Sequence, residues 1–300
     1  MQGKRTLIVG YGKLGQRITD SLSHQHDVTA LKRSPINHSD AIAMCVADVT
    51  HLTNLKAALN PSGIFDYLIY CLSPSERSEQ GYRDTYLTGL RNVMASLAKP
   101  TSLKHILFVS STSVYHQSHG EHVDEQSLCS PKNFSGKILL EAESFLAGLA
   151  IPSTSIRFSG IYGGSRSRLI DQVKQALLTK EPLVASPGFT NRIHEDDCVG
   201  FICHLVGLLD RDQTIESCYI ATDSCPVTQA EVYAYIAERL VLSQVDRTCK
   251  KENLKIFVSE EGKSLRRAGS KRCVNKRMLG SGYQLQFESY QEGYFSLLDG

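Results

Sequence analysis

Residues 6–15 read Thr-Leu-Ile-Val-Gly-Tyr-Gly-Lys-Leu-Gly, and this stretch decides the fold. Its first four residues are an apolar run typical of a short buried strand. From there, apolar residues recur at Leu14, Ile18 and Leu22, which is the spacing of a helix with one face on a core. The stretch therefore predicts a strand, a tight turn and a helix in direct succession.

The turn between strand and helix follows the pattern G-x-G-x-x-G. Gly10 permits a tight bend, Gly12 leaves room for a pyrophosphate, and Gly15 lets the helix pack closely. The first turn of a helix also presents N–H groups that lack partners and bind phosphate. The pattern predicts a dinucleotide site built from Gly10, Gly12, Lys13, Leu14 and Gly15, against the alternative of a turn that is merely rich in glycine.

Further strand-like runs and helical segments alternate as far as Gly160. The runs lie at residues 28–31, 42–46, 67–72, 105–110 and 154–158. This alternation predicts the α/β class and a Rossmann-type, doubly wound parallel sheet. Beyond Gly160 the rhythm is less regular. We therefore expect a dinucleotide-binding domain at 1–160 and a smaller C-terminal substrate-binding lobe at 161–300, partly interleaved with the first.

Composition narrows the range of partners. The chain has 33 basic and 31 acidic residues among 300, a formal net charge of +2, so no broad field attracts nucleic acid or an anionic membrane. The apolar run Thr6–Val9 is too short for a secretory signal or a membrane span. The nine cysteines are scattered without a C-x-x-C pair, which indicates reduced thiols. We expect a cytoplasmic protein that binds a small molecule rather than nucleic acid or a membrane.

The end of the second strand-like run indicates which dinucleotide binds. An NAD-binding chain usually has an acid here to accept from the ribose 2′-hydroxyl, whereas this chain has Lys32, Arg33 and Ser34. Cations suit the 2′-phosphate of NADP, because Arg presents a planar fork to it. We expect NADP, with NAD as the alternative. Asp48, followed by Val49, stands after the third run, where its carboxylate would accept from the adenine amino group or cap the next helix.

Four more segments join the glycine motif in a fixed order. They are Tyr70–Ser73, Val109–Tyr115, Arg157–Gly163 and Asn191–Asp197. With the glycine motif, their order and spacing extend over nearly the whole chain. Together they resemble the extended short-chain dehydrogenase/reductase superfamily, and within it the NAD-dependent epimerase/dehydratase group. Lys271–Lys276, followed by Gly282-Tyr283, is similar to the C-terminal signature of an atypical branch of small bacterial members.

The resemblance implies roles for individual residues. Ser111 would hold the catalytic hydroxyl position, four residues before Tyr115, and Lys137 would bind the nicotinamide ribose. The activity implied is that of an NAD(P)-dependent oxidoreductase or epimerase/dehydratase acting on a sugar or nucleotide-sugar. Residues lining the cofactor would include Cys71, Leu72 and Ser73, and those flanking the nicotinamide would be Phe158, Ser159, Gly160 and Ile161.

One position departs from the family pattern. The catalytic pair of the family is Tyr-x-x-x-Lys, in which the lysine lowers the tyrosine pKa so that the phenol can shuttle a proton. Here Asn133 stands at the tyrosine position before Lys137, and Asn does not titrate. The proton would have to move through Tyr115 or through a histidine in the following loop. The histidines are His116, His119 and His122, and an ordinary solvated loop is the alternative for them.

Three functions remain open after this loss. The first is an enzyme with an atypical active site that keeps Ser111 and Lys137. In the second, the fold binds NADP without turning it over and reports the cofactor level to a partner, as a regulatory or sensor protein; the loss of the titrating group is what this function predicts. In the third, a scaffold or assembly subunit holds the cofactor as a structural group.

Charged groups mark the predicted substrate lobe. Arg166, Arg168 and Arg192 would suit the diphosphate of a nucleotide-sugar, with exposed arginines that bind nothing specific as the alternative. We interpret Asp196 and Asp197 as the cap and first turn of the next helix, and not as a metal site. Residues 250–276 are the most basic part of the chain, containing Lys250-Lys251, Arg266-Arg267 and Lys271-Arg272. This segment is expected to be a solvated loop, with a phosphate-binding flap as the alternative.

The oligomeric state expected from the resemblance is a homodimer. Its interface would be a bundle built from helices at about 82–98 and 136–149. The second of these helices has apolar residues on more than one face, which indicates that it is buried against something.

Overall fold

The computed structural model describes residues 3–35, 42–60, 63–164, 166–242, 254–259 and 269–299. Cations of the basic stretch 250–276 that lie outside the described residues include Lys250, Lys251, Arg266 and Arg267. The chain divides into two compact units, each assembled from three stretches. Unit 1 comprises Met1–Val114, Asn133–Arg157 and Val199–Tyr219, and unit 2 comprises Tyr115–Lys132, Phe158–Cys198 and Ile220–Gly300.

Unit 1 is built on a seven-stranded sheet of order β12-β7-β5-β4-β1-β2-β3. β1 pairs in parallel with both β2 and β4, and the chain proceeds outward from β1 in both directions, which is the doubly wound arrangement. The Rossmann-type α/β fold predicted from the sequence is therefore confirmed. The strands are β1 (Lys4–Val9), β2 (His26–Lys32), β3 (Ala43–Val46), β4 (Tyr67–Tyr70), β5 (His105–Ser111), β7 (Ser153–Phe158) and β12 (Cys218–Ala221).

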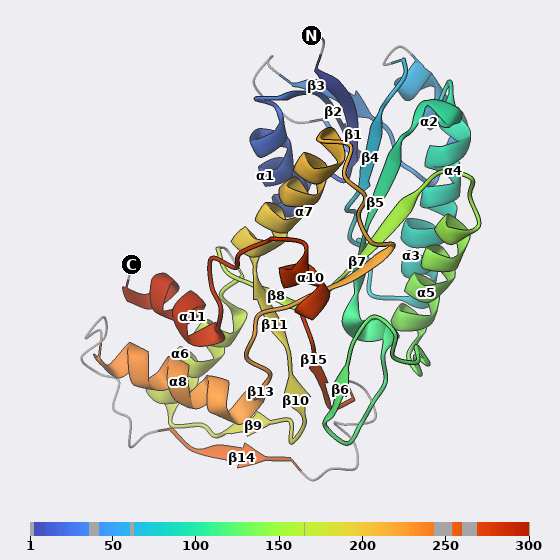
Figure 1. The fold of residues 1–300 in the computed structure, drawn as a ribbon. Helices are drawn as coiled ribbons and strands as arrows, with labels where there is room; N and C mark the ends of the chain where they lie inside the picture. Colours follow the sequence, from blue (N-terminus) through green and yellow to red (C-terminus); the bar gives the residue numbers. More distant parts are fainter. Residues whose placement is uncertain are drawn as a thin grey trace. The chain divides into compact units, whose positions relative to one another are not determined.

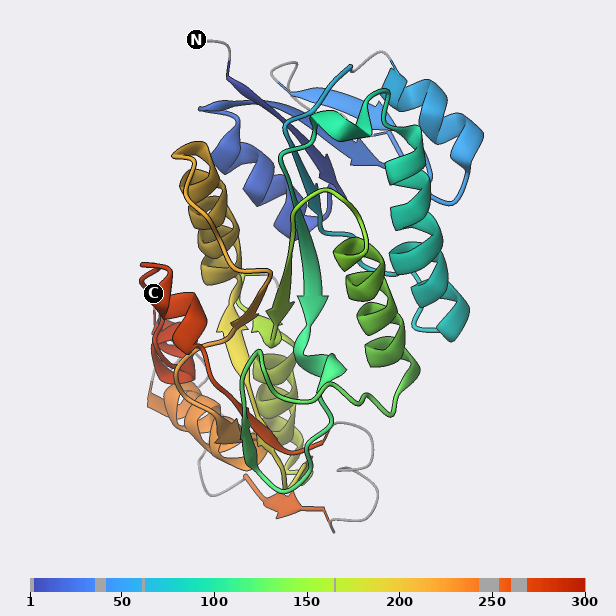
Figure 2. The same ribbon diagram turned by 45° about the vertical axis from the view of Figure 1, so that its right-hand side comes forward.

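Helices cover both faces of this sheet (Figure 1, Figure 2). One face carries α1 (Lys13–Leu22) and the part of α7 (Glu195–Asp210) from Val199 onward; the other carries α2 (Leu52–Leu59), α4 (Gly89–Ser96) and α5 (Phe134–Ala147). α1 buries Ile18 and Leu22, as the apolar spacing predicts. Between α3 (Glu79–Arg83) and α4 the helix continues as a π-helical turn at Asp84–Thr88, a distortion frequent at functional sites.

Unit 2 combines short strand pairs with a helical core. β6 (Glu121–Val123) pairs with β15 (Lys271–Cys273), β8 (Gly160–Tyr162) with β11 (Arg192–His194), and β9 (Leu183–Ala185) with β14 (Ile256–Val258), all in parallel. β10 (Phe189–Thr190) and β13 (Val227–Thr228) are antiparallel. Apolar residues of α6 (Arg168–Thr179), α8 (Gln229–Leu242) and α11 (Tyr290–Asp299) form one core, and α10 (Lys276–Gly280) follows β15.

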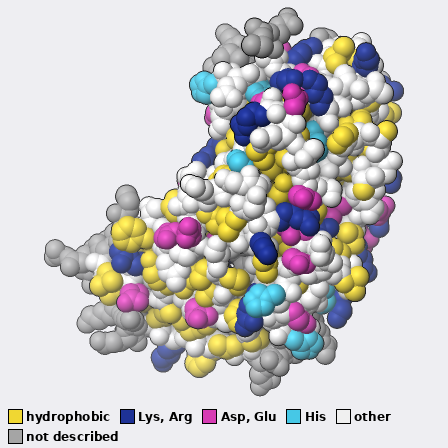
Figure 3. Space-filling model, in the orientation of Figure 1, with side chains coloured by type: hydrophobic (Ala, Val, Ile, Leu, Met, Phe, Trp, Pro, Cys, Tyr) yellow, Lys and Arg dark blue, Asp and Glu magenta, His cyan; other side chains and the backbone are white. Residues whose placement is uncertain are grey.

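Two surface properties bear on the partners expected from composition. Within the described ranges, no helix combines the length and apolar character that crossing a membrane requires. On the face shown in Figure 3, basic and acidic side chains are intermixed. This mixture agrees with the small net charge of the sequence.

Candidate functional site

The glycine turn of unit 1 owes its shape to close main-chain contacts. Gly10 adopts φ +112°, and a Cβ built on it would lie 2.9 Å from the Leu72 nitrogen and 3.0 Å from the Cys71 carbonyl carbon. A Cβ on Gly15 would overlap the Gly10 carbonyl oxygen. Only glycine fits at both positions, so α1 packs directly against the turn.

Gly12 is different because it has open space around it. A Cβ on Gly12 would meet no atom within 4 Å. Gly12 is the N-cap of α1 without a side-chain cap, and the first turn, which contains Lys13 and Leu14, has no acidic residue. The positive end of the α1 dipole therefore lies at Gly12, with no acid in the first turn to oppose an anion, which suits a phosphate.

The end of β2 brings cations to the same edge of the sheet. The Gly10 N–H donates to the Leu31 carbonyl (3.1 Å), and Lys32 and Arg33 come next in the chain. Arg33 is exposed, whereas the Lys32 ammonium lies 6.0 Å from the centre of the Tyr11 ring. The two cations predicted to bind a 2′-phosphate thus follow the residue that holds the glycine turn.

Asp48 forms the turn that precedes α2. Its Oδ1 accepts from the N–H and the hydroxyl of Thr50, at 2.9 and 2.7 Å, while the N-cap of α2 is His51. Burial raises the pKa of Asp48, but the Thr50 hydrogen bonds and the charges of His51 and Arg33 outweigh it, so the net shift is downward. Asp48 is thus a carboxylate at neutral pH beside Arg33. The adjacent Val49 carbonyl accepts from Asn92 Nδ2 at 2.8 Å.

The residues after β4 adjoin the glycine turn. The Cys71 N–H donates to the Val9 carbonyl (2.9 Å) and its Sγ to the Gly10 carbonyl (3.2 Å). Burial raises the pKa of the Cys71 thiol to about 12, so this thiol stays protonated and serves packing. Leu72 is half-buried and Ser73 is exposed.

Ser111, Asn133 and Lys137 are the unit 1 residues at the predicted catalytic positions. Ser111 ends β5, and its Oγ accepts from the Ser113 N–H at 3.1 Å, which leaves its hydroxyl able to donate. Asn133 is the N-cap of α5, where its Oδ1 accepts from the Gly136 N–H (2.7 Å) and the Ser135 hydroxyl (2.8 Å). Lys137 is exposed in the first turns of α5. Asn133 therefore has a structural task that a tyrosine could not perform.

A phenol that the sequence reasoning missed lies against the start of α5. The Tyr82 ring, on α3, meets Phe134 edge-on with centroids 5.4 Å apart, and it also contacts Tyr86 in the π-helical turn. No local sequence signal links α3 to α5, because the two helices are about fifty residues apart.

A buried ion pair fastens α5 to the sheet. Glu143 accepts from Arg157 on β7, with the shortest bond 2.6 Å from Nη2 to Oε2. The Ser110 hydroxyl on β5 donates to the same carboxylate at 2.5 Å. Both charged side chains are nine-tenths buried. The pair therefore helps to hold the helix that carries Asn133 and Lys137.

In unit 2, main-chain hydrogen bonds fix the segment predicted to flank the nicotinamide. Phe158 is buried at the end of β7, the Ser159 N–H donates to Ala221, and the Gly160 N–H donates to Asn191 (both 3.0 Å). Ile161 lies opposite Ile193 in the β8–β11 pair. The side chain of Tyr115, the phenol considered as a proton carrier, is 1% exposed.

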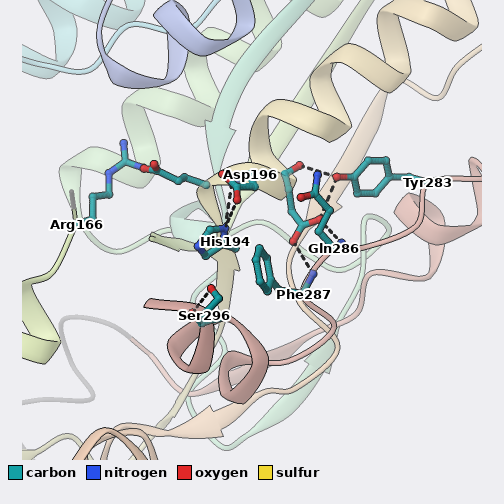
Figure 4. A network of polar contacts seen from close by, with 10 residues as sticks. Arg166, His194, Asp196, Tyr283, Gln286, Phe287 and Ser296 are labelled. Carbon is teal, nitrogen blue, oxygen red and sulfur yellow. Dashed lines mark hydrogen bonds and ion pairs between the residues drawn. The ribbon is translucent and has the colours of Figure 1, made fainter. Parts of the chain in front are cut away.

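The three predicted substrate arginines have different surroundings. Arg166, labelled in Figure 4, forms an ion pair with Glu195 in which Nη1 and Oε2 are 3.7 Å apart. Arg168 is exposed at the start of α6. Arg192 is only 7% exposed, and its Nη1 donates to Thr190 Oγ1 at 2.8 Å, so it lies in the interior of unit 2.

The two aspartates at the start of α7 have separate roles (Figure 4). Asp196 lies 3.3 Å from His194 Nδ1, and the His194 ring packs on Phe287 with centroids 4.2 Å apart. Asp197 is fully buried and accepts from the Tyr283 hydroxyl and from the N–H groups of Gln286 and Phe287. Asp197 thereby holds the segment before α11, a contact that reaches across almost ninety residues.

Asp223, which follows β12, is a buried acid with an incomplete set of partners. Its Oδ1 accepts from the Cys225 N–H (3.1 Å), while its Oδ2 has no hydrogen-bond partner among the described residues. Burial raises the pKa of Asp223 to about 7; the Cys225 N–H and Arg192 oppose this shift, and Asp197 adds to it. Tyr162, Tyr294 and the Cys225 thiol also interact electrostatically with it.

We expect Asp223→Asn to stabilise the protein more at pH 8 than at pH 4.5. The folded-state pKa is above the ordinary value of 3.8, so the stability given by the protonated acid is complete below about pH 4 and is lost as the pH rises towards 7. Asn keeps the bond to Cys225 without the charge. Thermal melts of both proteins from pH 4 to pH 8 test this, and an equal difference in Tm at every pH would contradict it.

The chain is similar to known proteins over most of its length. The model of the NAD dependent epimerase/dehydratase family matches residues 6–207. A solved structure from Methylobacillus flagellatus named for the same family is 34% identical, with a TM-score of 0.77 and coverage of 99% of this chain and 98% of that chain.

Two more distant structures share the fold. UDP-N-acetylglucosamine 4-epimerase from Bacillus cereus is 15% identical, with a TM-score of 0.71 and coverage of 99% of this chain and 100% of that one. UDP-glucose 4-epimerase from Thermus thermophilus, in complex with NAD, is 14% identical, with a TM-score of 0.74 and 98% of each chain covered. No curated protein matches the chain significantly. The resemblance seen in the motifs is confirmed, and the chain belongs to the NAD-dependent epimerase/dehydratase family.

Proposed function

We propose that the protein is an NADP-dependent enzyme of this family that acts on a nucleotide-sugar. The observation that carries the proposal is the glycine turn. Gly12 is the N-cap of α1 without a side-chain hydrogen bond, the first turn has no acid, and a Cβ at Gly12 would meet open space. A pyrophosphate fits that arrangement. When bound, the nicotinamide supplies a centre that accepts or donates hydride.

The preference for NADP rests on charge at the end of β2. Lys32 and Arg33 provide two cations, and Arg33 is exposed and free to turn towards a 2′-phosphate. In this proposal the Asp48 carboxylate accepts from the adenine amino group. NAD, which the family name and the Thermus thermophilus complex carry, remains the competing cofactor.

The residues of the proposed reaction keep the roles expected from the motifs. The Ser111 hydroxyl donates to the reacting oxygen of the substrate, and Lys137 binds the ribose hydroxyls. The main chain of Phe158–Ile161 flanks the nicotinamide. Arg166 and Arg168 bind the substrate diphosphate. The nucleotide-sugar is supported by the activities in the names of the two distant epimerases.

A regulatory NADP-binding protein is the second candidate. Its support is Asn133, whose amide caps α5 and cannot carry a proton. A protein of this kind would keep the phosphate cradle and lose turnover.

Calorimetric titration of the cofactor-free protein with NADPH and NADH separates these functions. Tight NADPH binding, followed by oxidation of the bound cofactor with a panel of 4-keto nucleotide-sugars, supports the enzyme. Tight binding without turnover favours the regulatory protein. Failure of both dinucleotides to bind would refute both proposals.

Arg33→Asp is expected to weaken NADPH binding roughly 10- to 100-fold, because a charged hydrogen bond is replaced by repulsion. NADH binding should stay the same or improve, since the new acid can accept from the 2′-hydroxyl. Lys99→Asp, the same charge reversal at an exposed loop position, is the control and should change neither affinity. Unchanged NADPH affinity in Arg33→Asp would assign the 2′-phosphate to other residues.

A further inference from the structure

Lys271, the first residue of β15, is a buried lysine in unit 2. Its side chain belongs to a residue that is only 7% exposed, and its Nζ donates to the main-chain carbonyl of Tyr115 at 3.3 Å. Within the ranges that the structure describes, no carboxylate pairs with this ammonium group. Burial accordingly lowers the pKa of Lys271, opposed only by Cys273. An ammonium group held this way has lost most of its water and has gained one neutral partner.

Two more titratable groups lie within electrostatic reach. His116 follows Tyr115 directly, so its main chain adjoins the carbonyl that Lys271 binds. Burial lowers the pKa of the His116 imidazole, and the charges of Lys132 and Lys271 lower it further. Among the described residues, neither His116 nor Lys132 pairs with an acid. We call His116, Lys132 and Lys271 the Lys271 cluster.

Gln117, the residue after His116, has a side-chain acceptor without a partner among the described residues. The Gln117 carbonyl accepts from the N–H of Ser270, the residue before Lys271, at 2.8 Å. The Gln117 side chain donates through Nε2 to the Leu128 carbonyl (3.1 Å), whereas its Oε1 is buried without a hydrogen-bond partner in the described part of the chain. A buried amide oxygen requires a donor, and a hydroxyl group can supply it.

We propose that the Lys271 cluster is a binding site for a hydroxylated oxyanion, either a sugar carboxylate or a sugar phosphate. The anion neutralises the ammonium groups of Lys271 and Lys132, which pair with no acid among the described residues, and a sugar hydroxyl donates to Gln117 Oε1. A buried charge without a counter-ion lowers the stability of the fold. A ligand that supplies the counter-ion therefore binds favourably and stabilises the folded protein. Only the identification of this ligand as part of the substrate rests on the proposed function. None of these residues belongs to the arginine set expected to bind the diphosphate.

The test is the melting temperature of the cofactor-free protein at constant ionic strength. Glucuronate and glucose 1-phosphate carry the two oxyanions, and glucose and sodium chloride are the blanks. At least one sugar anion is expected to raise the Tm in a saturable way, and neither blank should. The sugar anion that raises the Tm further shows whether the site prefers a carboxylate or a phosphate.

Lys271→Met separates a ligand site from a structural lysine. Methionine fills a similar volume without charge, so the ligand-free variant is expected to melt at or above the parent Tm and to lose the response to the anion. His116→Gln should weaken the apparent affinity roughly tenfold while the protein stays folded. Lys276→Met removes the same charge from an exposed position five residues on, and it should keep the response.

The contrary outcomes are distinct. If neither sugar anion shifts the Tm beyond chloride, or if Lys276→Met loses the response as fully as Lys271→Met, the cluster is not a specific site. If Lys271→Met melts well below the parent and His116→Gln keeps the full response, Lys271 is a structural clamp on Tyr115. Because no dinucleotide is present, failure here leaves the NADP proposal standing, and failure of the NADPH titration leaves this site standing.

Discussion

Gly10→Ala is expected to lower the free energy of unfolding by roughly 2–4 kcal/mol, whereas Gly12→Ala should leave it almost unchanged. At Gly10 the backbone has φ +112°, and the new Cβ would press on the main chain of Cys71 and Leu72. Those atoms continue β4 and cannot move alone. At Gly12 the new Cβ would enter open space.

Gly12→Ala, which is expected to keep its stability, should instead lose affinity for the dinucleotide. Gly12→Ala is expected to weaken NADPH binding at least roughly tenfold, because its methyl group would stand where the pyrophosphate approaches the main chain. Urea denaturation gives the stability and calorimetry gives the affinity. Normal NADPH binding by Gly12→Ala would place the pyrophosphate elsewhere, and equal destabilisation by both variants would show that the turn geometry is misassigned.

Glu143→Ala is the second change with a large expected effect, about 3–5 kcal/mol of lost stability. The substitution leaves the Arg157 guanidinium buried without its counter-ion and removes the acceptor of the Ser110 hydroxyl. Breaking one side of a buried pair costs more than removing both sides, so the double variant Glu143→Leu with Arg157→Met should recover part of the loss.

The control for Glu143→Ala lies two residues away on the same helix. Glu141 is about half exposed and pairs with Arg83 at 3.4 Å and Arg91 at 3.9 Å. Glu141→Ala should cost less than about 1 kcal/mol, as is usual for surface pairs. Similar urea midpoints for the two alanine variants would mean that the buried pair contributes no more than a surface pair.

Local sequence patterns are enough to predict most of the framework. The strand, the glycine turn and α1 follow from apolar spacing and the steric needs of glycine. The cations at the end of β2 can also be read directly, because they follow a recognisable strand.

Other features depend on contacts that no local pattern encodes. Lys271 lies in a polar stretch that reads as a solvated loop, yet pairing of β15 with β6 buries it against Tyr115, 156 residues away. Arg192 reads as a surface cation and is buried by the β8–β11 pair. Asn133 is a residue type that favours helix N-caps, so its capping role could be predicted from the sequence. The family pattern instead draws attention to the absence of a tyrosine at this position.

The interleaving of the two units also constrains how the nascent chain can fold. Unit 1 needs residues up to Tyr219, including the first part of β12 at the sheet edge, and unit 2 needs Ile220–Gly300 as well as two earlier stretches. During synthesis, segments of unit 2 therefore emerge from the ribosome before unit 1 can close its sheet. A ribosome-bound chain that stops before β12 should hold a six-stranded sheet with β7 as its unprotected edge, the form most in need of a chaperone.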